Sequence, residues 1–155
     1  MANKNRYRFG LMETASYSVA SATVIEQGDM LGYNSSTGCV YPANDETWNT
    51  NLATTQANFA AKFAGIAMDA SPAGSTAPIT VAMTGVFAMA QASATLALGA
   101  AVSPAQVGTT EKIASQSVVA STPRIGKAAK VYAAATTEVY IRIRSTYMPA
   151  AAAAT

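Results

Sequence analysis

The side chains that most often perform chemistry in enzymes are scarce in this sequence. It has no histidine and a single cysteine, Cys39, which excludes Ser-His-Asp and Cys-His catalysis as well as histidine-ligated or thiolate metal sites. Cys39 has no base near it in sequence, so an inert thiol is a better interpretation than a nucleophile. The eight carboxylates are scattered, at Glu13, Glu26, Asp29, Asp45, Glu46, Asp69, Glu111 and Glu138. We therefore predict that the chain is not an enzyme and has no catalytic residue, no metal site and no cofactor.

One short segment has a pattern suited to binding a partner. Arg6, Tyr7, Arg8 and Phe9 alternate cationic and aromatic side chains, so an extended strand here would have one basic and one aromatic face. Such a strand can add to an open sheet edge of a neighbouring protein, and its rings and charge also suit single-stranded nucleic acid. A net charge of only +2 favours the protein partner, and a disordered tail is an equally open interpretation. We predict that these four residues bind a partner protein and that nucleic acid is not bound.

The composition indicates a folded chain with an unusually uncharged surface. Hydrophobic residues make up 50% of the sequence, which is enough to fill a core, whereas charged residues make up 12%. This is about half of the ~25% usual in globular domains. A surface rich in Ala, Ser and Thr suits close packing against copies of the same chain or against a partner, so we expect self-association. No apolar run approaches a membrane span, and the basic N-terminus lacks the apolar run of a signal peptide, so synthesis in a cytoplasm is expected.

The elements that must position these residues are expected to be strands. Ile79, Val81 and Met83 alternate with smaller or polar residues, as do Val139, Ile141 and Ile143, which is the pattern of a strand with one buried face. Turn residues at 34–38 predict a hairpin between 30–33 and 39–41. A long polar loop, with a possible short helix near 53–62, follows. The predicted strands are 29–33, 63–70, 79–90, 125–132 and 138–144.

A weak internal repeat suggests how the chain is organised. Residues 25–31 align with 96–102, and residues 63–68 align with 124–129, although chance similarity among Ala- and Gly-rich segments is the alternative. The repeat predicts two similar β units that close one barrel or sandwich. We expect residues 1–20 to be an extended N-terminal arm outside the domain, residues 21–147 to be a single β domain, and residues 148–155 to be a frayed Ala-rich tail.

The order of several glycine-anchored segments resembles that of a known family. These segments are Gly28-Asp29-Met30-Leu31, Gly38-Cys39-Val40-Tyr41-Pro42-Ala43, Phe63-Ala64-Gly65-Ile66-Ala67, residues 79–86, Gly99-Ala100-Ala101-Val102 and Ile125-Gly126-Lys127-Ala128. The family consists of short phage and prophage proteins, formerly a domain of unknown function sometimes mislabelled recombinase-like, now regarded as capsid decoration (cement) proteins. The resemblance implies a small β-barrel or β-tulip body, usually a homotrimer, without an active site, that binds the major capsid protein on the outer capsid surface of the virion.

Two other functions stay open at this stage. One is a different virion component, such as a head-fibre base or a minor tail protein. The other is a non-catalytic carbohydrate-binding β module, for which Trp48 and a few tyrosines would be the available aromatic platforms. The expected fold is the same in each case: all-β, as a small barrel, β-tulip or sandwich.

Overall fold

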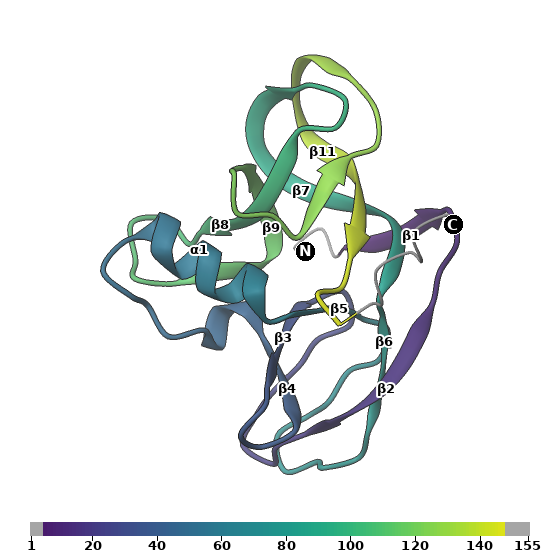
Figure 1. Ribbon diagram of the computed structural model, residues 1–155, viewed down its shortest axis with the longest axis vertical. Helices are drawn as coiled ribbons and strands as arrows, with labels where there is room; N and C mark the ends of the chain where they lie inside the picture. Colours follow the sequence, from purple (N-terminus) through teal and green to yellow (C-terminus); the bar gives the residue numbers. More distant parts are fainter. Residues whose placement is uncertain (1–4, 148–155) are drawn as a thin grey trace, which may run out of the picture.

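The computed structural model describes residues 5–147, and within them the chain forms eleven strands, one α-helix and one 3-10 turn (Figure 1). The all-β barrel fold expected from the sequence is confirmed. The predicted tail, 148–155, lies outside the described residues. The elements are β1 (Arg6–Phe9), β2 (Thr14–Val19), β3 (Met30–Asn34), β4 (Cys39–Pro42), η1 (Ala43–Asp45), α1 (Leu52–Ala61), β5 (Phe63–Ala67), β6 (Ile79–Ala82), β7 (Thr84–Leu96), β8 (Ala101–Gln106), β9 (Ile113–Ala120), β10 (Gly126–Ala128) and β11 (Tyr132–Arg144).

The first half of the chain closes a five-stranded barrel in the order β2-β4-β3-β5-β6, drawn at the bottom of Figure 1. The predicted hairpin is present, because β3 pairs with β4 antiparallel. The predicted strand 79–90 is divided, since β6 ends at Ala82 and β7 begins at Thr84. Met83 lies between them and donates its backbone N–H to the Glu13 carbonyl. The chain leaves the first barrel at this residue. The small core contains Val19, Ile25, Leu31, Val40, Ala64, Ala67, Ile79 and Val81.

The second half, together with β1, forms a sheet in the order β1-β7-β11-β10-β8-β9. An additional pairing between β7 and β9 closes the strands β7, β11, β10, β8 and β9 into a ring. Val139, Ile141 and Ile143 are buried in its interior, whereas Tyr140, Arg142 and Arg144 point away from it, as their alternation predicts. The core of this ring continues into the first half through Met30, Phe59 and Phe63. The two rings therefore share one large hydrophobic cluster.

Both rings have the same connectivity. In the first, β2 pairs parallel with β4 and antiparallel with β6; in the second, β7 pairs parallel with β9 and antiparallel with β11. The inner pairs also match, because β3 pairs with β4 and β5 just as β8 pairs with β9 and β10. The sequence predicted two units closing one barrel or sandwich. Each unit instead closes its own ring, so the shared barrel is not formed.

Two glycines at aligned positions of the repeat allow a close strand approach. A Cβ atom on Gly65 of β5 would overlap the carbonyl oxygen of Ala82, and a Cβ atom on Gly126 of β10 would contact that of Arg142. Gly65 also has a φ of +149°, a conformation that other residues rarely adopt. Both rings therefore need a glycine where two neighbouring strands lie too close for a Cβ atom. Composition alone does not reveal this requirement.

The polar insertion that follows β4 connects the rings. Its helix α1 matches the helix expected near 53–62, and Asn51 caps it by accepting a hydrogen bond from the Thr54 N–H at 2.9 Å. The buried Gln56 side chain donates to the Pro104 carbonyl at 2.8 Å and accepts from the Ser121 hydroxyl at 3.0 Å. These two bonds attach the helix of the first unit to β8 and the β9–β10 loop of the second.

The expectation that residues 1–20 form an arm outside the domain is wrong for residues 5–20. β1 pairs with β7, and β2 is a strand of the first barrel, paired with both β4 and β6. The physical reason is closure: without β2, the edges of β4 and β6 would be left with unpaired backbone groups.

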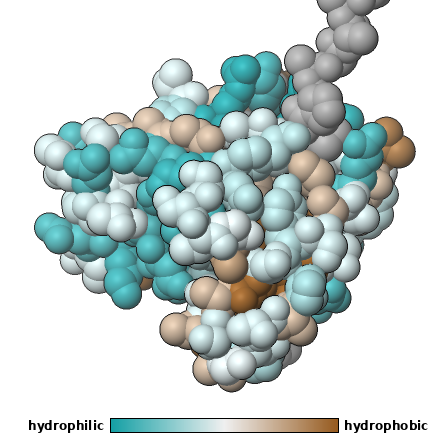
Figure 2. All heavy atoms as spheres, turned by 60° about the horizontal axis from the view of Figure 1, so that its bottom comes forward, coloured by the Kyte–Doolittle hydropathy of each residue, from teal (hydrophilic) through white to brown (hydrophobic). Residues whose placement is uncertain are grey.

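The face of the molecule at the end of the first barrel is mostly hydrophilic or weakly apolar (Figure 2). Seen from the end of the first barrel, the strongly apolar atoms gather mainly in a small depression (Figure 2). Within residues 5–147, no helix has both the length and the apolar composition needed to cross a bilayer.

Candidate functional site

The predicted partner-binding segment lies as strand β1 on the edge of the six-stranded sheet. Its register pairs Arg6 with Ala88, Tyr7 with Phe87 and Phe9 with Val86, so a bulge falls at Arg8. Residues directly paired across strands point to the same side of a sheet. The bulge therefore breaks the predicted alternation, because it brings Phe9 to the same side as the arginines.

The aromatic contacts agree with this register. The Tyr7 ring meets the buried Phe87 ring edge-on at a centroid distance of 5.8 Å, and its hydroxyl donates to the Gly10 carbonyl at 2.6 Å. Phe9 instead meets Tyr140 at 6.0 Å. The prediction of one basic and one aromatic strand face is thus wrong for Phe9.

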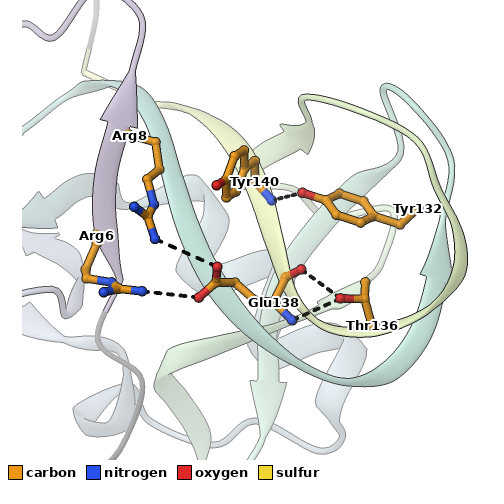
Figure 3. A network of polar contacts seen from close by, with 6 residues as sticks. All are labelled: Arg6, Arg8, Tyr132, Thr136, Glu138 and Tyr140. Carbon is orange, nitrogen blue, oxygen red and sulfur yellow. Dashed lines mark hydrogen bonds and ion pairs between the residues drawn. The ribbon is translucent and has the colours of Figure 1, made fainter.

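A carboxylate of β11 holds the two arginines in place (Figure 3). Glu138 accepts from Arg6 at 3.4 Å and lies 3.9 Å from the Arg8 guanidinium. Its backbone is fixed by Thr136, whose hydroxyl donates to the Glu138 carbonyl at 3.0 Å. Because all three charged side chains are at least one-third exposed, each ion pair contributes about 0–1 kcal/mol to stability. These pairs orient the arginines more than they stabilise the fold.

Cations also cover the tyrosine rings beside Glu138. The Lys130 ammonium lies 4.7 Å from the ring centroid of Tyr140 and 5.2 Å from that of Tyr132, and the Arg8 guanidinium lies 5.7 Å from Tyr140. The Tyr132 hydroxyl accepts the Tyr140 backbone N–H at 2.6 Å. Burial raises the pKa of Tyr132, an effect that this hydrogen bond partly offsets. Both rings are therefore occupied by cation-π contacts.

Further cations extend this surface along β10 and β11. Lys127 pairs directly with Arg142, and strand alternation places Arg142 and Arg144 on the side of Tyr140. All three are exposed. We define the basic-aromatic face as Arg6, Arg8, Phe9, Lys127, Lys130, Tyr132, Glu138, Tyr140, Arg142 and Arg144. It holds six of the ten Lys and Arg residues of the chain, against one carboxylate.

The structure brings Arg6, Arg8 and Phe9 together on this face and places Tyr7 on the other side of β1, against Phe87. The sequence prediction did not include the residues that β10, β11 and the loop between them contribute. The sequence pattern that could have indicated them is the alternation of Tyr140, Arg142 and Arg144 with buried apolar residues.

Elsewhere the described residues contain no group of three His, Cys, Asp or Glu side chains that could hold a metal ion. Cys39 is half-buried, and its sulfur lies 3.6 Å from the Thr37 carbonyl oxygen. A scan against models of protein families finds no match to the chain, and a search of curated proteins finds none either.

Proposed function

We propose that this chain is a structural virion protein that decorates and cements the outside of a bacteriophage capsid by binding the major capsid protein. The observation that supports this most is the basic-aromatic face, which presents six cations and a single carboxylate on one sheet surface. On a chain with 12% charged residues, this concentration of one charge sign favours an acidic partner surface. In this proposal the basic-aromatic face binds the capsid protein, whereas the sequence predicted that a free N-terminal arm would do so.

A pre-formed strand is a better docking element than a flexible arm. Ordering a free arm costs about 1–2 kcal/mol of backbone entropy per residue, whereas β1 is already held on β7. Among the described strands β1 pairs with β7 alone, so no strand within residues 5–147 pairs with its other edge. A strand of the capsid protein can add to that edge while acidic side chains meet the cations.

The same geometry argues against single-stranded nucleic acid as the partner. Base stacking needs exposed aromatic faces, and the rings of Tyr132 and Tyr140 are already covered by Lys130 and Arg8, which leaves Phe9 as the exposed ring of the face. Glu138 also offsets one of the two positive charges of Arg6 and Arg8. Acidic protein groups can bind the exposed cations without displacing these contacts.

The test is co-sedimentation with shells assembled from the major capsid protein of the same phage but lacking this chain. Saturable pelleting with the shells, without pelleting of the free protein, is the expected result. No pelleting at low salt, where charge attraction is strongest, would contradict the proposal. Electron microscopy of labelled particles separates it from a head-fibre base or minor tail protein, since label confined to a vertex or tail would favour those components.

The homotrimer belongs to the same proposal. Leu98 and Val131 are more than half exposed and offer apolar surface for contacts between copies. Light scattering should give three times the mass of the chain, either free in solution or after release from shells. A monomer mass under both conditions would remove the trimer from the proposal.

A further inference from the structure

An open cavity lies at the surface of the first barrel, and none of its lining residues belongs to the basic-aromatic face. Its volume is about 550 Å³, and it lies between the β3–β4 hairpin, the segment after β4, Lys62 and Tyr147. Cavities of about 300–1,000 Å³ are typical of small-molecule sites. We call it the tyrosine cavity, because Tyr33, Tyr41 and Tyr147 line it.

Contacts with neighbouring side chains hold the aromatic part of the lining. Tyr33 lies between Tyr17 and Tyr147, with ring centroids 5.7 Å and 5.1 Å away, and the Tyr33–Tyr147 pair is edge-to-face. Tyr41 is fixed by its hydroxyl, which donates to the Glu46 carboxylate, and by an edge-on contact with the buried Phe59. Burial, and then this hydrogen bond, raises the pKa of Tyr41, so it stays a protonated donor at neutral pH.

The polar part of the lining carries net negative charge. Glu46, with only 3% of its side chain exposed, accepts from the Lys62 ammonium at 2.9 Å. Asp45 beside it is exposed and forms no hydrogen bond or ion pair among residues 5–147. Ser35 and Thr37 add hydroxyl groups from the hairpin loop. Two carboxylates against one ammonium disfavour a phosphate or another anion.

We propose that the tyrosine cavity binds a neutral saccharide of one or two rings. A pyranose has C–H groups that can pack on tyrosine rings and hydroxyls that can donate to carboxylates and accept from hydroxyl groups. The cavity offers both kinds of partner side by side, in the rings of Tyr33 and Tyr147 on one hand and the exposed Asp45 carboxylate on the other. An apolar ligand would bury Asp45 without compensation, which is unfavourable. This proposal does not depend on capsid binding.

The test is saturation-transfer NMR of the full chain with glucose, galactose, mannose, N-acetylglucosamine and their disaccharides, at up to about 10 mM because weak binding is expected. At least one saccharide should bind saturably. Tyr147→Ala and Asp45→Asn should each weaken it about tenfold, through lost ring packing and a lost charged acceptor. Inorganic phosphate, as the anion probe, should not bind.

Two matched variants control for unspecific effects. Tyr7→Ala removes a tyrosine that is 40% exposed, against 41% for Tyr147, but lies on the other ring. Glu111→Gln neutralises an exposed carboxylate outside the cavity. Both should bind as the unchanged protein does. The proposal is overturned if no saccharide binds, if phosphate binds more tightly, or if the cavity variants weaken binding no more than these controls. Since Asp45 is exposed, Asp45→Asn keeps the test valid even where Tyr147→Ala destabilises the fold.

Discussion

The two rings have the same strand connectivity but carry different surfaces. The first ring has short strands and the insertion 43–62, which provides the carboxylates and Lys62 of the tyrosine cavity. The second has no such insertion, but its strands β7 and β11 each run for 13 residues and β1 is added at its edge. The two rings therefore share their pattern of strand pairing. Their candidate binding surfaces differ, because the insertion 43–62 is present only in the first ring and β1 and the long strands only in the second.

The largest expected loss of stability comes from disturbing the strand pairing that both rings share. Gly65→Ala and Gly126→Ala should each lower the free energy of unfolding by about 3 kcal/mol or more, because the added methyl group meets a backbone carbonyl of the neighbouring strand. Gly65→Ala should be the more harmful, since only Gly65 also has a positive φ. Denaturant unfolding measures both. The control is Gly74→Ala, which meets no atom within 4 Å and should cost only about 1–2 kcal/mol of backbone strain. Equal effects of all three variants would contradict the close approach.

A smaller effect tests how the insertion couples the rings. Gln56→Ala should lower the free energy of unfolding by about 1–3 kcal/mol, because it leaves the buried Pro104 carbonyl and the Ser121 hydroxyl without their partner. Asn58→Ala on the same helix should change it by less than about 0.5 kcal/mol. Thermal unfolding of the two variants makes the comparison. An equal, small change in both would mean that α1 does not join the rings.

The pH dependence should separate the rings further. Burial raises the pKa of Tyr17, Tyr41 and Tyr147 at the first ring and of Tyr132 at the second. A raised pKa in the folded state means that the protonated form stabilises it. That stability is complete below the ordinary tyrosine pKa of about 10 and declines as pH rises above it. Unfolding measured from pH 8 to 11 should show this decline, and Tyr41→Phe should flatten it more than Tyr132→Phe. An equal flattening by both variants would contradict the larger contribution expected from Tyr41.

The smallest expected effect on stability concerns the basic-aromatic face. Glu138→Gln removes two partly exposed ion pairs and should change the free energy of unfolding by less than about 1 kcal/mol. It should nevertheless strengthen binding to shells, because the only carboxylate of the face is lost. Unfolding and co-sedimentation are compared with Glu111→Gln, which should change neither. Weaker binding by Glu138→Gln would contradict this prediction and would show that orienting the arginines outweighs the charge of Glu138.

The strands that could be predicted are those with one large apolar face. Ile79 and Val81 in β6, and Val139, Ile141 and Ile143 in β11, are all buried as their alternation indicates. Strands β8 and β9 were not predicted, because small and polar residues carry most of their length and Pro104 argues against a central strand. Arg6 and Arg8 could be singled out from the sequence. Their ion pairs with Glu138 could not be predicted, because they depend on contacts between residues more than 130 positions apart in the sequence.

The most direct test of the proposed function compares two variants of equal net charge. Lys127→Gln combined with Arg142→Gln removes two positive charges from the basic-aromatic face, and Lys112→Glu lowers the net charge by the same two units in the exposed β8–β9 turn. Affinity for shells lacking this chain should fall about tenfold or more for the double variant and stay unchanged for Lys112→Glu. Equal affinities of the two variants would show that the basic-aromatic face does not bind the capsid.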